Sequence, residues 1–178
     1  MSAKRDESLF FDVWATAWGP MGAVASPAGL RRVVLPHFEF NDLVELLAWE
    51  HAGATRNTAP FEALIDLSRG YFNARPVDFD DILCDLPKES TFAGTVLRAC
   101  REIPYGRTLS YSQLAMQIGR EDAAHAVATA MGRNPVPLVV PCHRVTYADG
   151  RAGGFSAPGG PELKQRMLDL EGTGQTVA

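Results

Sequence analysis

Residues 134–146 read NPVPLVVPCHRVT, an apolar run set among prolines that ends in a cysteine and a histidine. Pro141 fixes the backbone just before Cys142 and suits the first position of a helical turn. In such a turn the Cys142 thiol lies near backbone N–H groups that favour its thiolate form. We therefore predict that Leu138-Val139-Val140 form a short buried strand, which delivers Cys142 to the start of a turn.

His143 follows Cys142 directly, and adjacent side chains in an extended chain point apart. A turn at Pro141 would let the imidazole reach the thiol through one water molecule rather than by direct contact. A histidine that acts as a base needs an acceptor that orients it. Glu171, in the segment MLDLEG, is one candidate among several acids. A thiol hydrolase, a thiol-based reductase and an alkyl-transfer protein all remain open on these residues alone.

The composition is that of an ordinary globular protein. The 178 residues, 46% hydrophobic and 21% charged, suffice for one domain or two small ones. No apolar stretch approaches the length of a membrane span, and the charged start MSAKRDESLFFD lacks the apolar core of a signal peptide. Cys84, Cys100 and Cys142 form no CxxC pair, which fits a reducing compartment. We expect a cytoplasmic protein without a metal site, a cofactor or a membrane partner.

Charge is divided unevenly along the chain. Residues 1–87 contain 7 Lys and Arg against 13 Asp and Glu, a net charge of −6. Residues 88–178 contain 10 against 8, a net charge of +2, so the two parts sum to the −4 of the whole chain. A surface that binds a polyanion is therefore expected in the C-terminal half.

The first half predicts strands followed by helices. Residues 9–36 alternate apolar runs with Gly and Pro turn signals, which predicts a meander of about three strands. Apolar residues at helical spacing predict helices over 42–53 and 59–72. An acidic connector follows, and we place a domain boundary inside it, near residues 86–90. The expected domains are 1–87 and 88–178.

The second half predicts mainly helices. Thr91 is a plausible N-cap for a helix over 92–103, and Ser110 for one over 111–118. Gly119 ends that second helix, and Asp122 is expected to open the next, over 123–132. Two short helices joined by a tight turn with glycine indicate a helix-turn-helix. The alanines of the last helix fit either close approach to another surface or simply high helix propensity.

Several motifs together resemble one known family. IPYGRTLSYSQLA, AMGRNP, NPVPLVVPCHRV and GGFS followed by LDLEG occur in that order. They resemble the O6-alkylguanine-DNA alkyltransferases, also called methylated-DNA–protein-cysteine methyltransferases, over roughly residues 90–172. GPMGAVASPAGLRRVVLP is weakly similar to that family's leading domain. The resemblance implies an α/β protein with an N-terminal ribonuclease-H-like domain and a C-terminal, mainly helical, winged-helix-like domain that carries the helix-turn-helix.

The resemblance also implies a chemistry. Cys142 would take an alkyl group from O6 of a damaged guanine, once per protein molecule, because the thioether is not cleaved. His143 would activate Cys142 through water, with Glu171 orienting it. Asn134 would brace the turn, and Tyr111 would donate a hydrogen bond to the guanine ring. The alternatives are a non-catalytic protein that binds alkylation damage, and a thiol hydrolase or peroxidase that uses Cys142 and His143.

The partner implied is double-stranded DNA that carries O6-alkylguanine, bound by a monomer, with the base flipped out of the stack. The second helix of the helix-turn-helix would enter the minor groove. The residues expected to line the pocket are Met131, Val145, Phe155 and Ser156. Those expected at the DNA are His125, Ala124, Ala126, Ala128, Arg133 and Arg98. Further phosphate contacts are expected among Arg101, Arg107, Arg120, Arg144 and Arg151. His125 stands where this family usually has an arginine.

Overall fold

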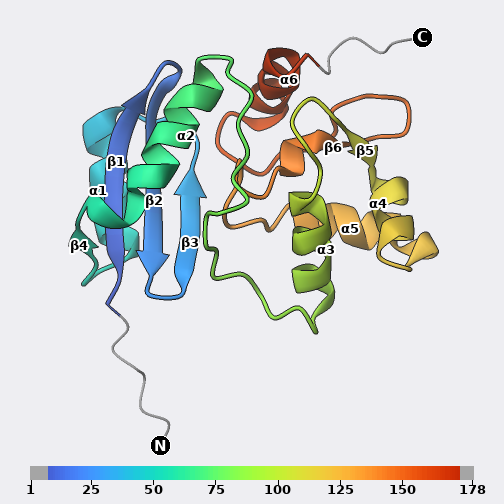
Figure 1. Ribbon diagram of the computed structural model, residues 1–178, viewed down its shortest axis with the longest axis horizontal. Coiled ribbons are helices and arrows are strands. Elements are labelled where there is room, and N and C mark those ends of the chain that lie inside the picture. Colours follow the sequence, from blue (N-terminus) through green and yellow to red (C-terminus); the bar gives the residue numbers. More distant parts are fainter. Residues whose placement is uncertain (1–7, 173–178) are drawn as a thin grey trace, which may run out of the picture.

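The structure is a computed structural model that describes residues 8–172. Its N-terminal half is a four-stranded sheet with a helix on each face (Figure 1). The strands are β1 (Phe10–Thr16), β2 (Gly19–Ser26), β3 (Gly29–Val34) and β4 (Thr55–Arg56). Across the sheet they lie in the order β3-β2-β1-β4. The first three are antiparallel, which confirms the predicted meander, and β4 runs parallel to β1. The two-residue β4 was not predicted.

Alternation along β1 sends side chains to both faces of the sheet. Phe11 and Val13 pack with Leu43 and Leu47 of α1 (Phe40–Glu50). Trp14 packs on the other side, and its indole N–H donates to Ser68 Oγ of α2 (Glu62–Phe72) at 2.9 Å. A 3₁₀ turn, η1 (Ala59–Phe61), precedes α2. The two helices predicted for this half are therefore confirmed.

The outer edge of β3 is paired with segments from later in the chain. The backbone N–H of Leu30 donates to the carbonyl of Leu83, in the connector, at 2.8 Å. Further along the strand, Val33 N–H donates to the carbonyl of Pro135 at 2.9 Å. One buried hydrophobic cluster extends from Trp14 to Cys142. The sheet thus packs directly against the segment that holds Cys142, and the domain boundary near residues 86–90 stays a prediction.

The C-terminal half is mainly helical. Its elements are α3 (Phe92–Arg101), β5 (Leu109–Ser110), α4 (Tyr111–Gln117), α5 (Ala124–Met131), β6 (Val145–Thr146) and α6 (Gly160–Leu170). β5 and β6 pair in parallel, and α4 and α5 pack together on the side of the molecule away from the sheet (Figure 1). The α/β class is confirmed, while the ribonuclease-H-like and winged-helix-like descriptions stay predictions. Within residues 8–172, no helix is both long and apolar enough to cross a membrane.

Side-chain caps fix where two of these helices begin. Thr91 Oγ1 accepts the N–H of Gly94 at 3.1 Å, and Ser110 forms a capping box with Gln113. Both predicted caps are confirmed. The cap predicted at Asp122 is wrong, because the chain forms a 3₁₀ turn, η2 (Glu121–Ala123), before α5. That turn contains Asp122, so its side chain does not occupy the position that precedes α5.

Candidate active site

The segment before Cys142 is a tight turn, and the strand predicted over residues 138–140 is wrong. Leu138 has a φ of 77°, and the backbone N–H of Val140 donates back to the carbonyl of Val136 at 3.0 Å. Pro137 has no N–H with which to extend a strand ladder. A 3₁₀ turn, η3 (Cys142–Arg144), follows directly, with Arg144 N–H bonded to the Pro141 carbonyl at 2.8 Å. The helical turn predicted at Pro141 is confirmed.

Asn134 holds this turn together from within. Its Nδ2 donates to the carbonyl of Val140 at 2.8 Å, and its Oδ1 accepts the N–H of Val136 at 3.0 Å. The same side chain hydrogen-bonds to Cys142, which lowers the pKa of the thiol. Asn134 therefore lies where the sequence predicts a brace.

Cys142 is buried, with 5% of its surface exposed. Burial raises the pKa of its thiol above the ordinary value and outweighs the opposing effects of Asn134, the Lys164 charge and nearby backbone N–H groups. The backbone N–H groups act in the predicted direction, but they do not make the thiolate the favoured form. Removal of the thiol proton therefore requires a base.

His143 is fully buried and linked to Glu171. Its Nε2 lies 2.6 Å from Glu171 Oε1, while its Nδ1 has no hydrogen-bond partner among the described residues. A carboxylate oxygen can only accept, so Nε2 carries the hydrogen and Nδ1 presents a lone pair. Burial lowers the pKa of His143 despite the opposing effect of Glu171, which keeps the ring neutral. A neutral ring with a free lone pair is the form a general base requires.

Besides His143, three residues bind the Glu171 carboxylate. Arg144 donates from Nε to Oε2 at 2.9 Å, Gly106 N–H donates to Oε2 at 3.0 Å, and Tyr71 Oη donates to Oε1 at 2.8 Å. Burial raises the pKa of Glu171, but the hydrogen bonds from His143 and Arg144 and the positive charge of Arg144 outweigh it and lower the pKa to about 2. Arg144 is 5% exposed and fully engaged here. Its expected contact with a phosphate is therefore wrong.

A cavity of about 380 Å³ opens beside Cys142. Of the predicted pocket residues, Met131, Phe155 and Ser156 line it together with Tyr111, whereas Val145 does not. The Val145 side chain is fully buried and its carbonyl accepts from Lys164 Nζ at 2.6 Å. The other lining residues are Ala128, Gly132, Tyr147, Gly154 and Lys164.

The predicted DNA-contact residues divide between two places. His125 and Ala126 are exposed on α5, and Ala128 of the same helix reaches the cavity beside Cys142. Arg133 is exposed just beyond the end of α5. Arg98 instead lies on α3, where its Nη1 donates to the carbonyls of Pro87 and Gly94 at 2.8 and 3.1 Å. The structure thus brings the α5 residues together with the cavity but does not bring Arg98 to them.

Two comparisons identify the family. A family model described as "6-O-methylguanine DNA methyltransferase, DNA binding domain" matches residues 91–173. A methylated-DNA–protein-cysteine methyltransferase from Mycolicibacterium paratuberculosis is 44% identical over 153 residues, which is 83% of this chain and 89% of the relative. The chain belongs to the methylated-DNA–protein-cysteine methyltransferase family.

Solved structures of this family share the fold. The crystal structure of Mycobacterium tuberculosis O6-methylguanine methyltransferase is 29% identical, with a TM-score of 0.74 and coverage of 96% of each chain. The crystal structure of Mycobacterium tuberculosis OGT in complex with DNA has a TM-score of 0.76, also at 29% identity, and the match covers 94% of this chain and 96% of that one. The resemblance recognised in the sequence is therefore confirmed across both halves of the chain.

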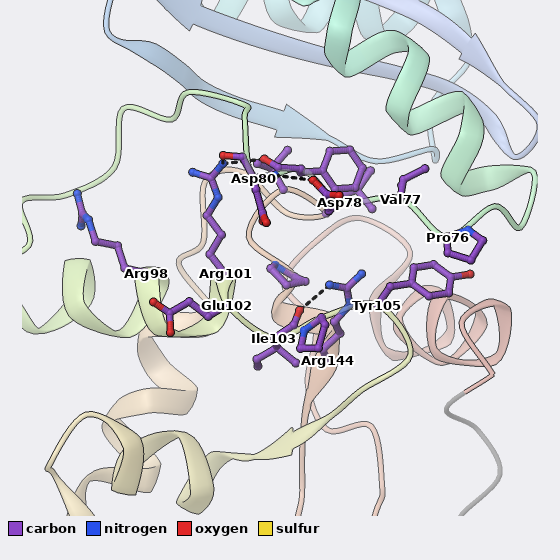
Figure 2. Close-up of a pocket in the computed structure, with 15 residues that line it drawn as sticks. Pro76, Val77, Asp78, Asp80, Arg98, Arg101, Glu102, Ile103, Tyr105 and Arg144 are labelled. Carbon is purple, nitrogen blue, oxygen red and sulfur yellow. Dashed lines mark hydrogen bonds between the residues drawn. The ribbon is translucent and has the colours of Figure 1, made fainter.

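A larger cavity, of about 820 Å³, lies on the side of the turn that carries Pro141 and Arg144. Figure 2 shows Arg101 reaching from α3 to the connector, where its Nη2 donates to the carbonyls of Phe79, Asp80 and Ile82. Cys142 does not line this cavity. Its arginines are occupied by backbone carbonyls and by Glu171, so the smaller cavity is the candidate site for this methyltransferase-family chain. Within residues 8–172, no three His, Cys, Asp or Glu side chains could hold a metal ion.

Three residues of the site were missed in the sequence. Tyr71 is buried 100 residues before its partner Glu171, and burial raises the pKa of its hydroxyl. Lys164 is 1% exposed, and its Nζ also lies 3.4 Å from Tyr111 Oη. Tyr147 stands half-exposed at the cavity. Tyr71 and Lys164 fall at apolar-face positions of their helices, which is the one signal that they are buried.

Proposed function

We propose that this protein repairs DNA by moving an alkyl group from O6 of guanine onto Cys142, once per molecule. The observation that carries the proposal is a buried cysteine that lines a cavity of about 380 Å³, followed by a buried histidine whose Nε2 lies 2.6 Å from Glu171 Oε1. The family to which the chain belongs is named for this reaction.

The step requires the side chains already described and one water molecule. The Cys142 sulfur forms a bond to the alkyl carbon as the bond from that carbon to O6 breaks, and the electron pair of the broken bond stays on the guanine. The thiol proton passes through one water to the free Nδ1 of His143. His143 returns that proton to water and the guanine anion takes one proton from water, so the products are a thioether, a neutral His143 and an unmodified base. Tyr111, which lines the cavity, would donate a hydrogen bond to the ring as charge develops there.

Burial of Cys142 and His143 sets the protonation state that each residue needs for its role. The raised pKa of Cys142 keeps it a thiol until substrate arrives, and the lowered pKa of His143 keeps its base form populated at neutral pH. Glu171 fixes which ring nitrogen carries the hydrogen, and Arg144 keeps that carboxylate ionised. Asn134 would act on the turn rather than on the substrate.

The DNA would meet α5. Its exposed His125 and Ala126 lead along the helix to Ala128 and Met131, which line the cavity. Small side chains permit close approach to a groove, and a flipped base would then enter the cavity. Arg133, exposed beyond the helix end, is placed to contact a phosphate. We expect a monomer that acts in the cytoplasm, where the three unpaired cysteines would stay reduced.

The test mixes the protein with a duplex that contains one O6-methylguanine, followed by peptide mass spectrometry. We expect the Cys142 peptide to gain the mass of one CH₂, because a methyl group replaces the thiol hydrogen, and the reaction to stop at one equivalent. The Cys142→Ala variant should bind the duplex without transfer, while Cys84→Ala should transfer normally. If the wild type binds the duplex but Cys142 is not methylated, the result would support a non-catalytic protein that binds alkylation damage. Repeated turnover on a small electrophile, with no methylated peptide, would indicate a thiol hydrolase or peroxidase.

A further inference from the structure

Tyr147 occupies an unusual position for a large aromatic residue of the site. It lines the same cavity as Cys142, yet 48% of its surface is exposed against 5% for the cysteine. The ring therefore lies at the mouth of the cavity. It belongs to a loop that turns back on itself, where Tyr147 N–H donates to the Arg151 carbonyl at 2.9 Å and Gly150 N–H donates to the Tyr147 carbonyl at 3.0 Å.

The ring is packed against three other groups. The Tyr111 ring packs against it edge-on, with centroids 5.5 Å apart and planes at 65°. The Arg151 guanidinium lies over it at 5.3 Å from the centroid, and Arg151 is itself paired with Asp149 at 2.7 Å. Gly153, with a φ of 76°, passes so close that an added Cβ would lie 3.2 Å from Tyr147 Cε2 and 3.0 Å from Tyr111 Oη.

These contacts limit how far the ring can move aside. Retreat past Gly153 is blocked by backbone, and rotation away from Tyr111 breaks both the edge contact and the cation–π contact. The cavity of about 380 Å³ is near the small end of ligand pockets, which span about 300–1,000 Å³. Met131 and Phe155 add bulky side chains to its wall, beside smaller residues such as Ala128 and Ser156. A guanine that enters therefore leaves little room for a large group on O6.

We propose that Tyr147 is a specificity-determining residue that sets an upper limit on the size of the O6 substituent this site accepts. The substrates favoured are guanines with small alkyl groups, and those excluded carry aromatic or long-chain groups. Arg151 acts as a positioning residue, because it touches the ring and does not line the cavity. The inference rests on the proposed alkyl transfer to Cys142.

The experiment compares two duplexes that differ only in carrying O6-methylguanine or O6-benzylguanine. Single-turnover rates on both are measured for the wild type, Tyr147→Ala, Tyr147→Phe and Arg151→Ala. The benzyl-to-methyl rate ratio should rise roughly tenfold or more in Tyr147→Ala, the scale on which pocket size discriminates substrates. Tyr147→Phe keeps the ring and should keep the wild-type ratio, and Arg151→Ala should raise the ratio by less than Tyr147→Ala.

The ratio does not depend on the fraction of protein that is folded, so a destabilised variant still gives an answer. An unchanged ratio in Tyr147→Ala overturns the inference. A ratio that falls also overturns it, because the ring would then favour aromatic groups by stacking on them. Failure of the wild type to transfer methyl at all would instead overturn the proposed function, and the two failures are distinguishable by that first measurement.

Discussion

Tyr71 Oη lies 2.8 Å from Glu171 Oε1 and 3.3 Å from His143 Nε2, although 100 residues of sequence separate Tyr71 from Glu171. Tyr71 belongs to α2, on the sheet of the N-terminal half, and its side chain is fully buried. The N-terminal half therefore supplies a hydrogen-bond donor to the carboxylate that orients the histidine. It also supplies β3, whose Val33 binds the Pro135 carbonyl next to Asn134.

Replacement of Tyr71 by Phe should weaken this link without leaving a cavity. Hydrogen bonds to charged groups contribute about 1.5–3 kcal/mol, so the free energy of unfolding in urea should fall by that amount. The transfer rate should fall roughly tenfold, which corresponds to about 1.4 kcal/mol of barrier. Tyr105→Phe is the matched control, since Tyr105 packs on Tyr71 but donates to the Leu170 carbonyl. Equal rate losses in both variants would contradict a specific role for Tyr71.

Asn134 should be needed for both stability and reactivity. Asn134→Ala leaves the Val136 N–H unpaired, at a cost of about 1–3 kcal/mol, and removes one of the two hydrogen bonds that the Val140 carbonyl accepts, the other coming from Cys142 N–H. Unfolding in urea should therefore begin at clearly lower concentration. Asn134→Asp keeps the acceptor for Val136 but places a negative charge by the thiol, which raises the pKa of Cys142 further. Its transfer rate should therefore show a stronger dependence on pH than that of Asn134→Ala. Identical pH profiles would contradict contact between this side chain and Cys142.

Local signals in the sequence predicted the elements that depend on near neighbours. The meander follows from strand alternation and turn glycines, and the helix starts at Thr91 and Ser110 follow from side chains that bond within one turn. The strand predicted over residues 138–140 was wrong because the sequence Leu-Val-Val has strand propensity, whereas the chain reverses direction there with Leu138 at positive φ. That conformation is stabilised by Asn134 and by packing rather than by propensity.

Contacts between distant segments could not be predicted in the same way. β4 consists of two polar residues, Thr55 and Arg56, and exists because β1 offers a free edge. Cys142 and His143 were recognised from their own motif, and Glu171 from the resemblance. The link from Tyr71 to Glu171 had no local sign, because an aromatic residue on an apolar helix face usually just fills the core.

His125 offers a direct test of how α5 meets DNA. Its side chain is exposed on that helix, so His125→Arg adds a positive charge without disturbing the core. If α5 contacts the backbone, the slope of log binding constant against log salt should steepen by about 0.9, the value for one additional phosphate contact. Titration of a labelled duplex at several salt concentrations measures that slope. Ala48→Arg is the control, because Ala48 is exposed on α1, at the far end of the molecule from α5 (Figure 1). A steeper slope in both variants would indicate a general charge effect instead.

Lys164 should make stability rise at alkaline pH. Burial lowers its pKa to about 8 from an ordinary value of 10.5. Between these two values the unfolded chain binds more protons than the folded one, so the contribution of Lys164 to stability increases as the pH rises. The difference between the two pKa values predicts that the free energy of unfolding rises by about 2 kcal/mol between pH 7.5 and pH 10, relative to that of Lys164→Met, which has no such proton to lose. Urea unfolding of both proteins at the two pH values measures it, with Lys88→Met, at an exposed lysine, as the control. Parallel pH dependence of the wild type and Lys164→Met would show that the buried ammonium is stabilised fully by its contacts with the Val145 carbonyl and Tyr111.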